Sequence, residues 1–133
     1  MTGTPKQEIP VLIYRYQGPR RNIGYTLSPF YVKEQLEVSK DDMLFIYAED
    51  FEYIQPFVEK HFPLIDAFTG ESMDKFDPCW DNPLMKEAWL VILEDLEKYP
   101  FEELELGSFI EKFMTWVRKH VHQADGIEVS GNL

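Results

Sequence analysis

Residues 76–93 read FDPCWDNPLMKEAWLVIL, and this stretch decides how the second half of the chain folds. Asn82 followed by Pro83 is typical of a helix start, because Asn caps a helix N-terminus and Pro is favoured at the first helical position. The apolar residues that follow recur at helical intervals, which predicts an amphipathic helix over 83–99. Pro100 would end this helix.

A second amphipathic helix is predicted over 109–124. Ser108 and Glu111 have the spacing of a capping box, and an apolar stripe with helical spacing follows them. Basic residues lie near the C-terminal turns, where they interact favourably with the helix dipole: Arg118, Lys119 and His120.

Strands are expected mainly before these helices. Residues 9–16 and 43–49 are rich in β-branched and aromatic side chains, and 9–16 is expected to be a central strand. Residues 127–129 can form a short closing strand. The predicted fold class is α+β, with early strands in an antiparallel or mixed sheet packed against the two late helices.

Two segments of the first half are ambiguous. Residues 25–38 contain Ser28-Pro29, a good helix start, but their apolar and polar residues also alternate as in a strand, so both structures stay open. Apolar residues between Phe51 and Phe62 recur at helical spacing, and Pro56 would kink that helix or mark its start.

The length of 133 residues predicts a single domain over 1–133, with 1–8 as a flexible N-terminal segment. A single cysteine cannot form an intramolecular disulfide, and the N-terminus does not resemble a signal peptide. Eighteen consecutive apolar residues occur nowhere, so no membrane span is expected. These features favour a cytoplasmic protein, and they do not define its oligomeric state.

The charge of this chain is concentrated in its middle. The formal net charge is −11, and residues 41–111 carry nineteen acidic and four basic side chains. A strongly negative field opposes binding to nucleic acids and to anionic membranes. It would instead steer a basic protein toward the acidic region, although acidity can also serve solubility alone.

No catalytic, cofactor or metal site is predicted. The familiar phosphate-binding, dinucleotide-binding and metalloprotease motifs are absent, and the acids of the 63–82 loop lack the spacing of a calcium-binding loop. Cys79 near a helix start could be a nucleophile, but Asp77 and Asp81 would raise its pKa, and a free cysteine is commonly buried as a small apolar residue.

Trp80 lies outside both apolar stripes, in the long acidic segment before the first late helix. An aromatic residue in such a place can anchor a partner, although burial beneath the helix is the alternative. Acidic residues cluster on either side of that helix and form two expected patches. The predicted partner-binding residues are Glu71, Asp74, Phe76, Asp77, Trp80, Asp81, Glu102, Glu103 and Glu105.

The segment from Phe76 onward, with DPCWDNPLMKEAWLVILEDLE and the closing ADGIEVSGNL, resembles the C-terminal part of small acidic bacterial proteins. Some proteins of that type are immunity partners of secreted toxins. The resemblance implies a protein that binds a toxin domain, often a basic nuclease, and masks its active site.

The function expected from the sequence is a protein-binding module, most specifically an immunity-type protein that neutralises a basic toxin domain through an acidic surface. Two alternatives remain. The first is a small enzyme that uses loop carboxylates or Cys79, and the second is a structural or regulatory domain.

Overall fold

A computed structural model describes residues 9–19, 23–34 and 36–133. The predicted flexible segment 1–8 lies outside the described residues. In chain order the elements are β1 (Val11–Leu12), β2 (Gly24–Phe30), the 3-10 helix η1 (Lys40–Asp42), β3 (Leu44–Tyr47), α1 (Ala48–Phe51), α2 (Gln55–Glu59), β4 (Leu64–Ile65), β5 (Ser72–Met73), β6 (Asp81–Met85), α3 (Lys86–Lys98), α4 (Leu104–Val121) and β7 (Gly126–Gly131).

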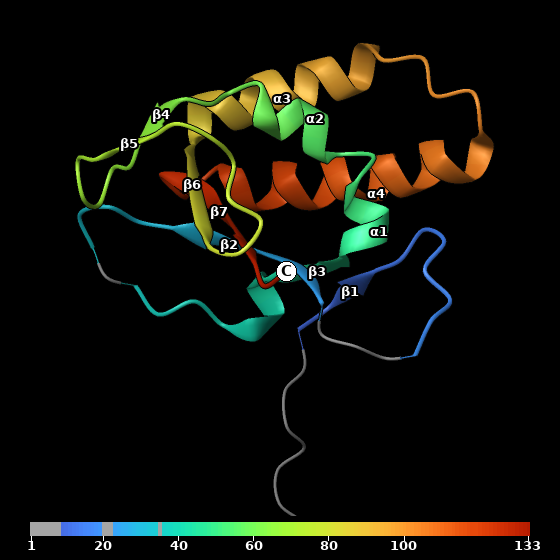
Figure 1. The fold of residues 1–133 in the computed structure, drawn as a ribbon, viewed down its shortest axis with the longest axis horizontal. Helices are drawn as coiled ribbons and strands as arrows, with labels where there is room; N and C mark the ends of the chain where they lie inside the picture. Colours follow the sequence, from blue (N-terminus) through green and yellow to red (C-terminus); the bar gives the residue numbers. More distant parts are fainter. Residues whose placement is uncertain (1–8, 20–22, 35) are drawn as a thin grey trace, which may run out of the picture.

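The chain forms a mixed α+β fold, as predicted. One sheet has the strand order β1-β3-β2-β7-β6, in which only the β1–β3 pair is parallel. A small second sheet contains β4 and β5. Figure 1 shows α3 and α4 side by side above the five-stranded sheet.

The core lies between this sheet and the helices. Along β2, Tyr25 and Leu27 are buried in the core, whereas Thr26 and Ser28 alternate with them and are only partly covered. Trp89 on α3 is fully buried, and its Nε1–H donates to the Ile127 carbonyl at 2.9 Å, which joins the helix to β7.

The centre of the sheet differs from the prediction. The expected closing strand 127–129 is part of β7, which lies between β2 and β6. The expected central strand 9–16 contributes only Val11–Leu12, at the sheet edge. It ends early because the buried carboxylate of Asp50 accepts hydrogen bonds from the backbone N–H groups of Tyr14 and Arg15 at 2.9 and 3.0 Å.

The helix predicted to begin at Pro83 begins at Lys86 instead, because residues 81–85 form β6. The Lys86 N–H donates to the Asp125 carbonyl, which fixes the hydrogen-bonding pattern of β6. Alternate residues of β6 direct their backbone N–H and C=O groups toward β7, and the backbone nitrogen of Pro83 points to the free edge of the sheet. A proline without an N–H is tolerated there, and it also blocks the pairing of another strand.

Residues 25–38 are a strand only in their first part, since β2 ends at Phe30. The β2–β3 pairing stops at Leu27, whereas the β2–β7 pairing continues to Phe30. The Phe30 carbonyl points toward β7, where it accepts from the Asp125 N–H. The backbone nitrogen of Pro29 therefore points to the opposite side of β2, where β3 no longer pairs, so its lack of a hydrogen leaves no sheet bond unmade. The helix start suggested by Ser28-Pro29 is therefore wrong.

The second late helix begins at Leu104, five residues before its predicted start at Phe109. Ser108 does not cap it, because the Gly107 N–H already donates to the Glu103 carbonyl at 2.9 Å. The helix ends at Val121 and not at Ala124. The helical spacing after Phe51 corresponds to the short α1 and α2, and Pro56 is the second residue of α2.

Candidate partner-binding surface

The turn before β6 is held from inside the protein by Asn82. The side chain of Asn82 is fully buried, and its Oδ1 accepts from the Asp77 N–H at 2.7 Å. Its Nδ2 group donates to the carbonyls of Asp77, Trp80 and Val129 at 2.8, 3.1 and 2.9 Å. The sequence context of Asn82 suggests a helix cap. In the structure, Asn82 instead fixes the 77–80 turn against β7.

The same turn is also bound to the C-terminal segment. The Gly131 N–H donates to the Trp80 carbonyl at 3.0 Å, and the Leu133 N–H donates to the Pro78 carbonyl at 3.2 Å. The Cys79 thiol donates to the Leu133 carbonyl at 2.7 Å. These contacts and those of Asn82 restrain the backbone on both sides of Trp80.

The indole of Trp80 is exposed, with 70% of its surface open to solvent. Asp77 and Asp81 are exposed on either side of it. Asp77 Oδ1 accepts from the Cys79 N–H at 2.9 Å, and Asp81 Oδ1 accepts from the Ser130 hydroxyl at 2.7 Å. Neither carboxylate forms an ion pair with a described residue, so both charges remain available to a partner.

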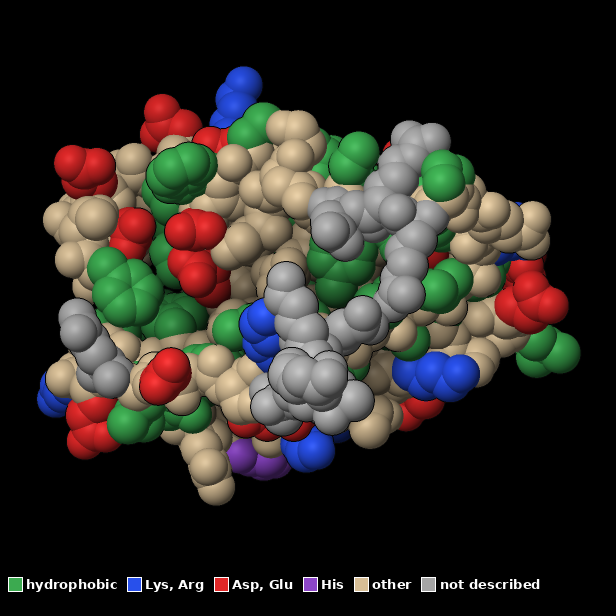
Figure 2. Space-filling view, turned by 90° about the horizontal axis from the view of Figure 1, so that it is seen from below, with side chains coloured by type: hydrophobic (Ala, Val, Ile, Leu, Met, Phe, Trp, Pro, Cys, Tyr) green, Lys and Arg blue, Asp and Glu red, His purple; other side chains and the backbone are tan. Residues whose placement is uncertain are grey.

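The acidic character continues onto β7, where Glu128 pairs with Ser28 of β2 and Pro83 of β6. Burial, together with smaller contributions from the nearby carboxylates of Asp81 and Asp66, raises the pKa of Glu128 to about 7. Figure 2 views the side of the sheet away from α3 and α4, and one half of it gathers acidic and hydrophobic side chains. We call Asp77, Trp80, Asp81 and Glu128 the Trp80 surface.

The other predicted residues of this segment, Glu71, Asp74 and Phe76, differ in their exposure to solvent. Glu71 and Asp74 are exposed next to the β4–β5 hairpin. Phe76 is only 8% exposed, and its ring packs against Tyr25, Phe51 and Phe62. The prediction that Phe76 anchors a partner is therefore wrong, because its ring belongs to the core.

The second predicted patch, Glu102, Glu103 and Glu105, lies in the α3–α4 connection and the first turn of α4. All three side chains are exposed, and Glu103 forms an ion pair with Arg15. The thirteen residues of α3 span about 20 Å at 1.5 Å per residue, and this patch lies beyond its C-terminal end. The Trp80 surface lies near the other end of α3, and Figure 1 shows this separation of β6 from the α3–α4 connection.

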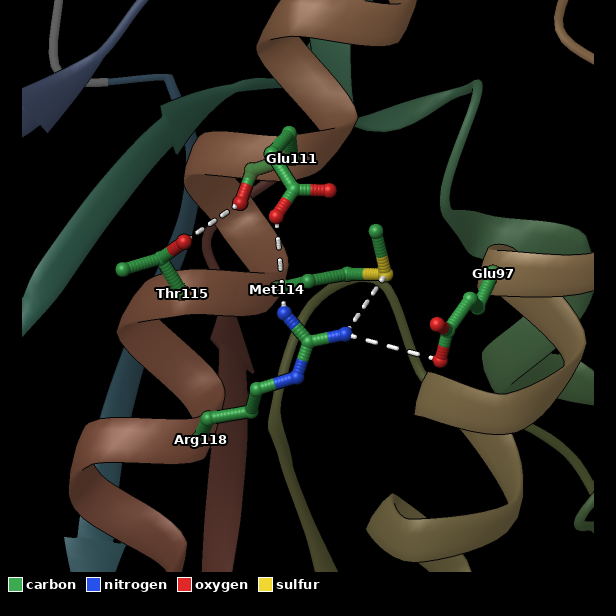
Figure 3. A network of polar contacts seen from close by, with 5 residues as sticks. All are labelled: Glu97, Glu111, Met114, Thr115 and Arg118. Carbon is green, nitrogen blue, oxygen red and sulfur yellow. Dashed lines mark hydrogen bonds and ion pairs between the residues drawn. The ribbon is translucent and has the colours of Figure 1, made fainter.

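Several acidic residues of the helices already have cationic partners. Arg118 of α4 reaches Glu111 at 3.5 Å and Glu97 of α3 at 3.7 Å, and its Nη2 lies 3.9 Å from the Met114 sulfur, as Figure 3 shows. The same figure shows the Thr115 hydroxyl donating to the Glu111 carbonyl at 2.9 Å. Lys60 pairs with Asp95. On the helical side, part of the acidic charge is therefore paired within the protein, whereas Asp77 and Asp81 have no ion pair with a described residue.

Cys79 is exposed, which contradicts the interpretation of this residue as a buried packing residue. Within the described part of the chain, its thiol has no hydrogen bond to a histidine. His120 lines a pocket of about 290 Å³ together with Asp42 and Lys119, and burial lowers the pKa of this imidazole. That pocket does not include Cys79, so the arrangement expected of a cysteine nucleophile with its base is not formed there.

Sequence reasoning missed Asn82 as a buried residue and Glu128 as part of the surface. The alternation of Ile127, Glu128 and Val129 held the signal for Glu128, because it places the carboxylate on the face opposite the core. The role of Asn82 had no local signal, since its partners include Val129, which is far along the chain.

Comparisons with protein-family models, curated proteins and solved structures found no match to this chain. Among the described residues, no helix is long and apolar enough to cross a membrane. Within the same residues, no group of three or more His, Cys, Asp or Glu side chains could hold a metal ion.

Proposed function

We propose that this chain is a protein-binding module that recognises a basic protein through the Trp80 surface. The observation that carries this proposal is an exposed indole on a fixed turn between two carboxylates that form no ion pair with any described residue. Tryptophan is among the residues that contribute most to binding energy in protein interfaces. A turn that is already ordered loses little conformational entropy when a partner docks.

The charge distribution supports a basic partner. The chain carries a net charge of −11, and most of its acidity lies between residues 41 and 111. Such a field speeds the encounter with a positively charged protein and disfavours nucleic acids and anionic membranes. Glu71 and Asp74 would form the rim of the contact, whereas Glu102, Glu103 and Glu105 would act mainly in steering.

More specifically, we propose an immunity-type function in the cytoplasm, in which the partner is a basic toxin domain. Carboxylates of the Trp80 surface would then occupy positions where such a domain normally binds phosphate. This assignment follows the expectation drawn from the segment from Phe76 onward, which resembles small acidic bacterial proteins of which some are immunity partners of toxins.

The test starts with capture of the partner. The tagged chain is used to isolate proteins from its native host, and the bound proteins are identified by mass spectrometry. Binding of the purified partner is then compared between wild type, Trp80→Ala and the control Leu104→Ala, whose side chain is 90% exposed in the other acidic region.

We expect Trp80→Ala to weaken binding by at least about 30-fold, which corresponds to a hot-spot loss of about 2 kcal/mol. Leu104→Ala should leave the affinity within about twofold. Equal affinity of wild type and Trp80→Ala for the captured partner would overturn the proposal.

A further inference from the structure

A second pocket lies beside the Trp80 surface, between α1–α2 and the 77–80 turn. Its volume is about 390 Å³, within the range of roughly 300–1,000 Å³ typical of small-ligand sites. Pro78 links the two, since it belongs to the turn that carries Trp80 and also lines the pocket. The other lining residues are Tyr25, Ala48, Glu52, Gln55, Pro56, Glu59 and Leu133.

The charged groups that line this pocket are all negative. Among the described residues, the carboxylates that line it are those of Glu52 and Glu59, and no lysine, arginine or histidine does so. Glu59 Oε1 accepts from the Gln55 side chain at 2.6 Å. The Glu52 side chain has no hydrogen bond or ion pair with a described residue. A cationic group that enters the pocket would therefore meet two carboxylates and no positive charge from a described lining residue.

Apart from the two carboxylates, the polar side chains of the lining are the Gln55 carboxamide and the Tyr25 hydroxyl. Pro56, Pro78 and Leu133 offer surfaces against which an alkyl chain can pack. Burial raises the pKa of Tyr25 to about 12, with smaller contributions from Glu59, Cys79 and Glu52. The Tyr25 hydroxyl thus stays protonated at neutral pH and keeps its hydrogen-bonding capacity.

We propose that this pocket receives one arginine side chain of the basic partner, an inference that rests on the proposed function and specifies how the partner is held. An arginine combines a methylene stem with a planar group that stacks on flat surfaces and carries five N–H donors. These donors can serve two separate carboxylates and a hydroxyl at once. The compact ammonium group of lysine lacks this fixed fork.

The test uses the full chain and a blocked tripeptide, acetyl-Gly-Arg-Gly-amide, followed by ¹H–¹⁵N NMR. Matched peptides carry citrulline, which has nearly the same shape without the charge, or lysine. We expect the arginine peptide to shift the amide signals of Ala48, Glu52, Glu59 and Cys79, with a Kd on the order of 1 mM. The citrulline and lysine peptides should bind at least about tenfold and threefold more weakly, respectively.

The variant Glu52→Gln/Glu59→Gln removes both charges at exposed positions. The control Glu34→Gln/Glu87→Gln removes the same total charge at exposed positions outside the pocket. Arginine-peptide binding should fall at least about tenfold in the pocket variant and stay within about twofold in the control.

Equal binding of arginine and citrulline peptides, or equal loss in both variants, would overturn the assignment of a cation pocket. Equal binding of the lysine peptide would overturn the assignment to arginine. With the captured partner, an unchanged affinity of Glu52→Gln/Glu59→Gln together with dependence on Trp80 would refute this inference and leave the proposed function standing. Failure of the wild-type chain to bind any basic protein would refute the proposed function instead.

Discussion

The Trp80 surface, with its 77–81 turn, and the 99–105 connection between α3 and α4 are both acidic. Both also expose large hydrophobic side chains, but the two regions are built differently. In the first, Asn82 fixes the backbone from inside, and Asp77 and Asp81 have no cationic partner in the part of the chain that the structure describes. In the second, Glu103 is paired with Arg15. Acidic residues in a sequence therefore do not all provide charge that a partner can use.

The hydrophobic side chains of the two regions differ in the same way. Among the described residues, no aromatic ring contacts that of Trp80, which presents its indole to solvent. Tyr99 is also exposed, but its ring packs against those of Phe57 and Phe101, with ring centroids 5.6 and 4.7 Å apart. A partner at the second region would have to compete with contacts that the chain makes itself, whereas the Trp80 surface is available without rearrangement.

The largest effect is expected from removing the core support beneath β7. Trp89→Ala should lower the free energy of unfolding by roughly 3–5 kcal/mol, because it leaves a cavity and removes the side-chain donor to the Ile127 carbonyl. Urea unfolding measures this loss, with Leu90→Ala on the exposed side of α3 as the control. A loss below about 1 kcal/mol would show that α3 does not support β7 as described.

Asn82→Ala should have the next largest effect, a loss of roughly 2–3 kcal/mol in the free energy of unfolding. The substitution leaves the Asp77 N–H and the Val129 carbonyl without their side-chain partner. The exposed amide variant Gln123→Ala should change stability by less than about 0.5 kcal/mol. If Asn82→Ala is equally mild, the turn is not fixed from inside and the contrast between the two regions disappears.

Glu128 provides a smaller, pH-dependent test of the Trp80 surface. Its pKa rises from the ordinary 4.5 to about 7 on folding, so the folded protein holds this proton more tightly than the unfolded chain. The contribution of this group to stability is therefore favourable at low pH and is lost as the pH rises from about 4.5 to about 7. Glu128→Gln should remove this component of the pH dependence.

The measurement is urea unfolding between pH 4.5 and pH 8. Relative to wild type, Glu128→Gln should gain stability as the pH rises, whereas the exposed control Glu87→Gln should keep the wild-type pH dependence. Parallel curves for wild type and Glu128→Gln would mean that Asp81, Asp66 and burial do not act on Glu128 as described.

The smallest effect is expected in the second region. Arg15 and Glu103 have side chains that are 57% and 42% exposed, and exposed ion pairs contribute little to stability. In urea unfolding, Arg15→Ala should therefore reduce stability much less than Trp89→Ala or Asn82→Ala does. A loss as large as that of Asn82→Ala would show that this connection is fixed as firmly as the 77–81 turn.

The sequence predicted the helices better than their starts. The apolar stripes of 83–99 and 109–124 lie on α3 and α4, because helical spacing is a local signal. The start signals were misleading. Asn82-Pro83 also suits an edge strand, and Ser108 and Glu111 also suit the interior of a helix. The central position of β7 depends on pairing with β2, nearly one hundred residues away, which no local pattern reveals.

The candidate site was predictable to a similar degree. Trp80 and its flanking acids were found because they lie outside the apolar stripes, and their role in binding stays a prediction. Phe76 was misplaced because a single aromatic residue in a loop carries no sign of burial. The pocket with Glu52 and Glu59 combines α1–α2, the 77–80 turn and the C-terminal segment, so only the fold brings it together.

The most direct test of the difference between the two regions is the binding kinetics of matched charge reversals with the captured partner, at low and high salt. Asp74→Lys/Asp81→Lys alters the segment of the Trp80 surface, and Glu102→Lys/Glu105→Lys alters the second region by the same total charge. We expect the first variant to raise the dissociation rate at least about tenfold, because it places repulsion in the contact. The second should slow association at low salt, weaken its salt dependence and leave dissociation within about twofold. The reverse pattern, or no change of either rate in both variants, would contradict the assignment of the Trp80 surface as the contact region.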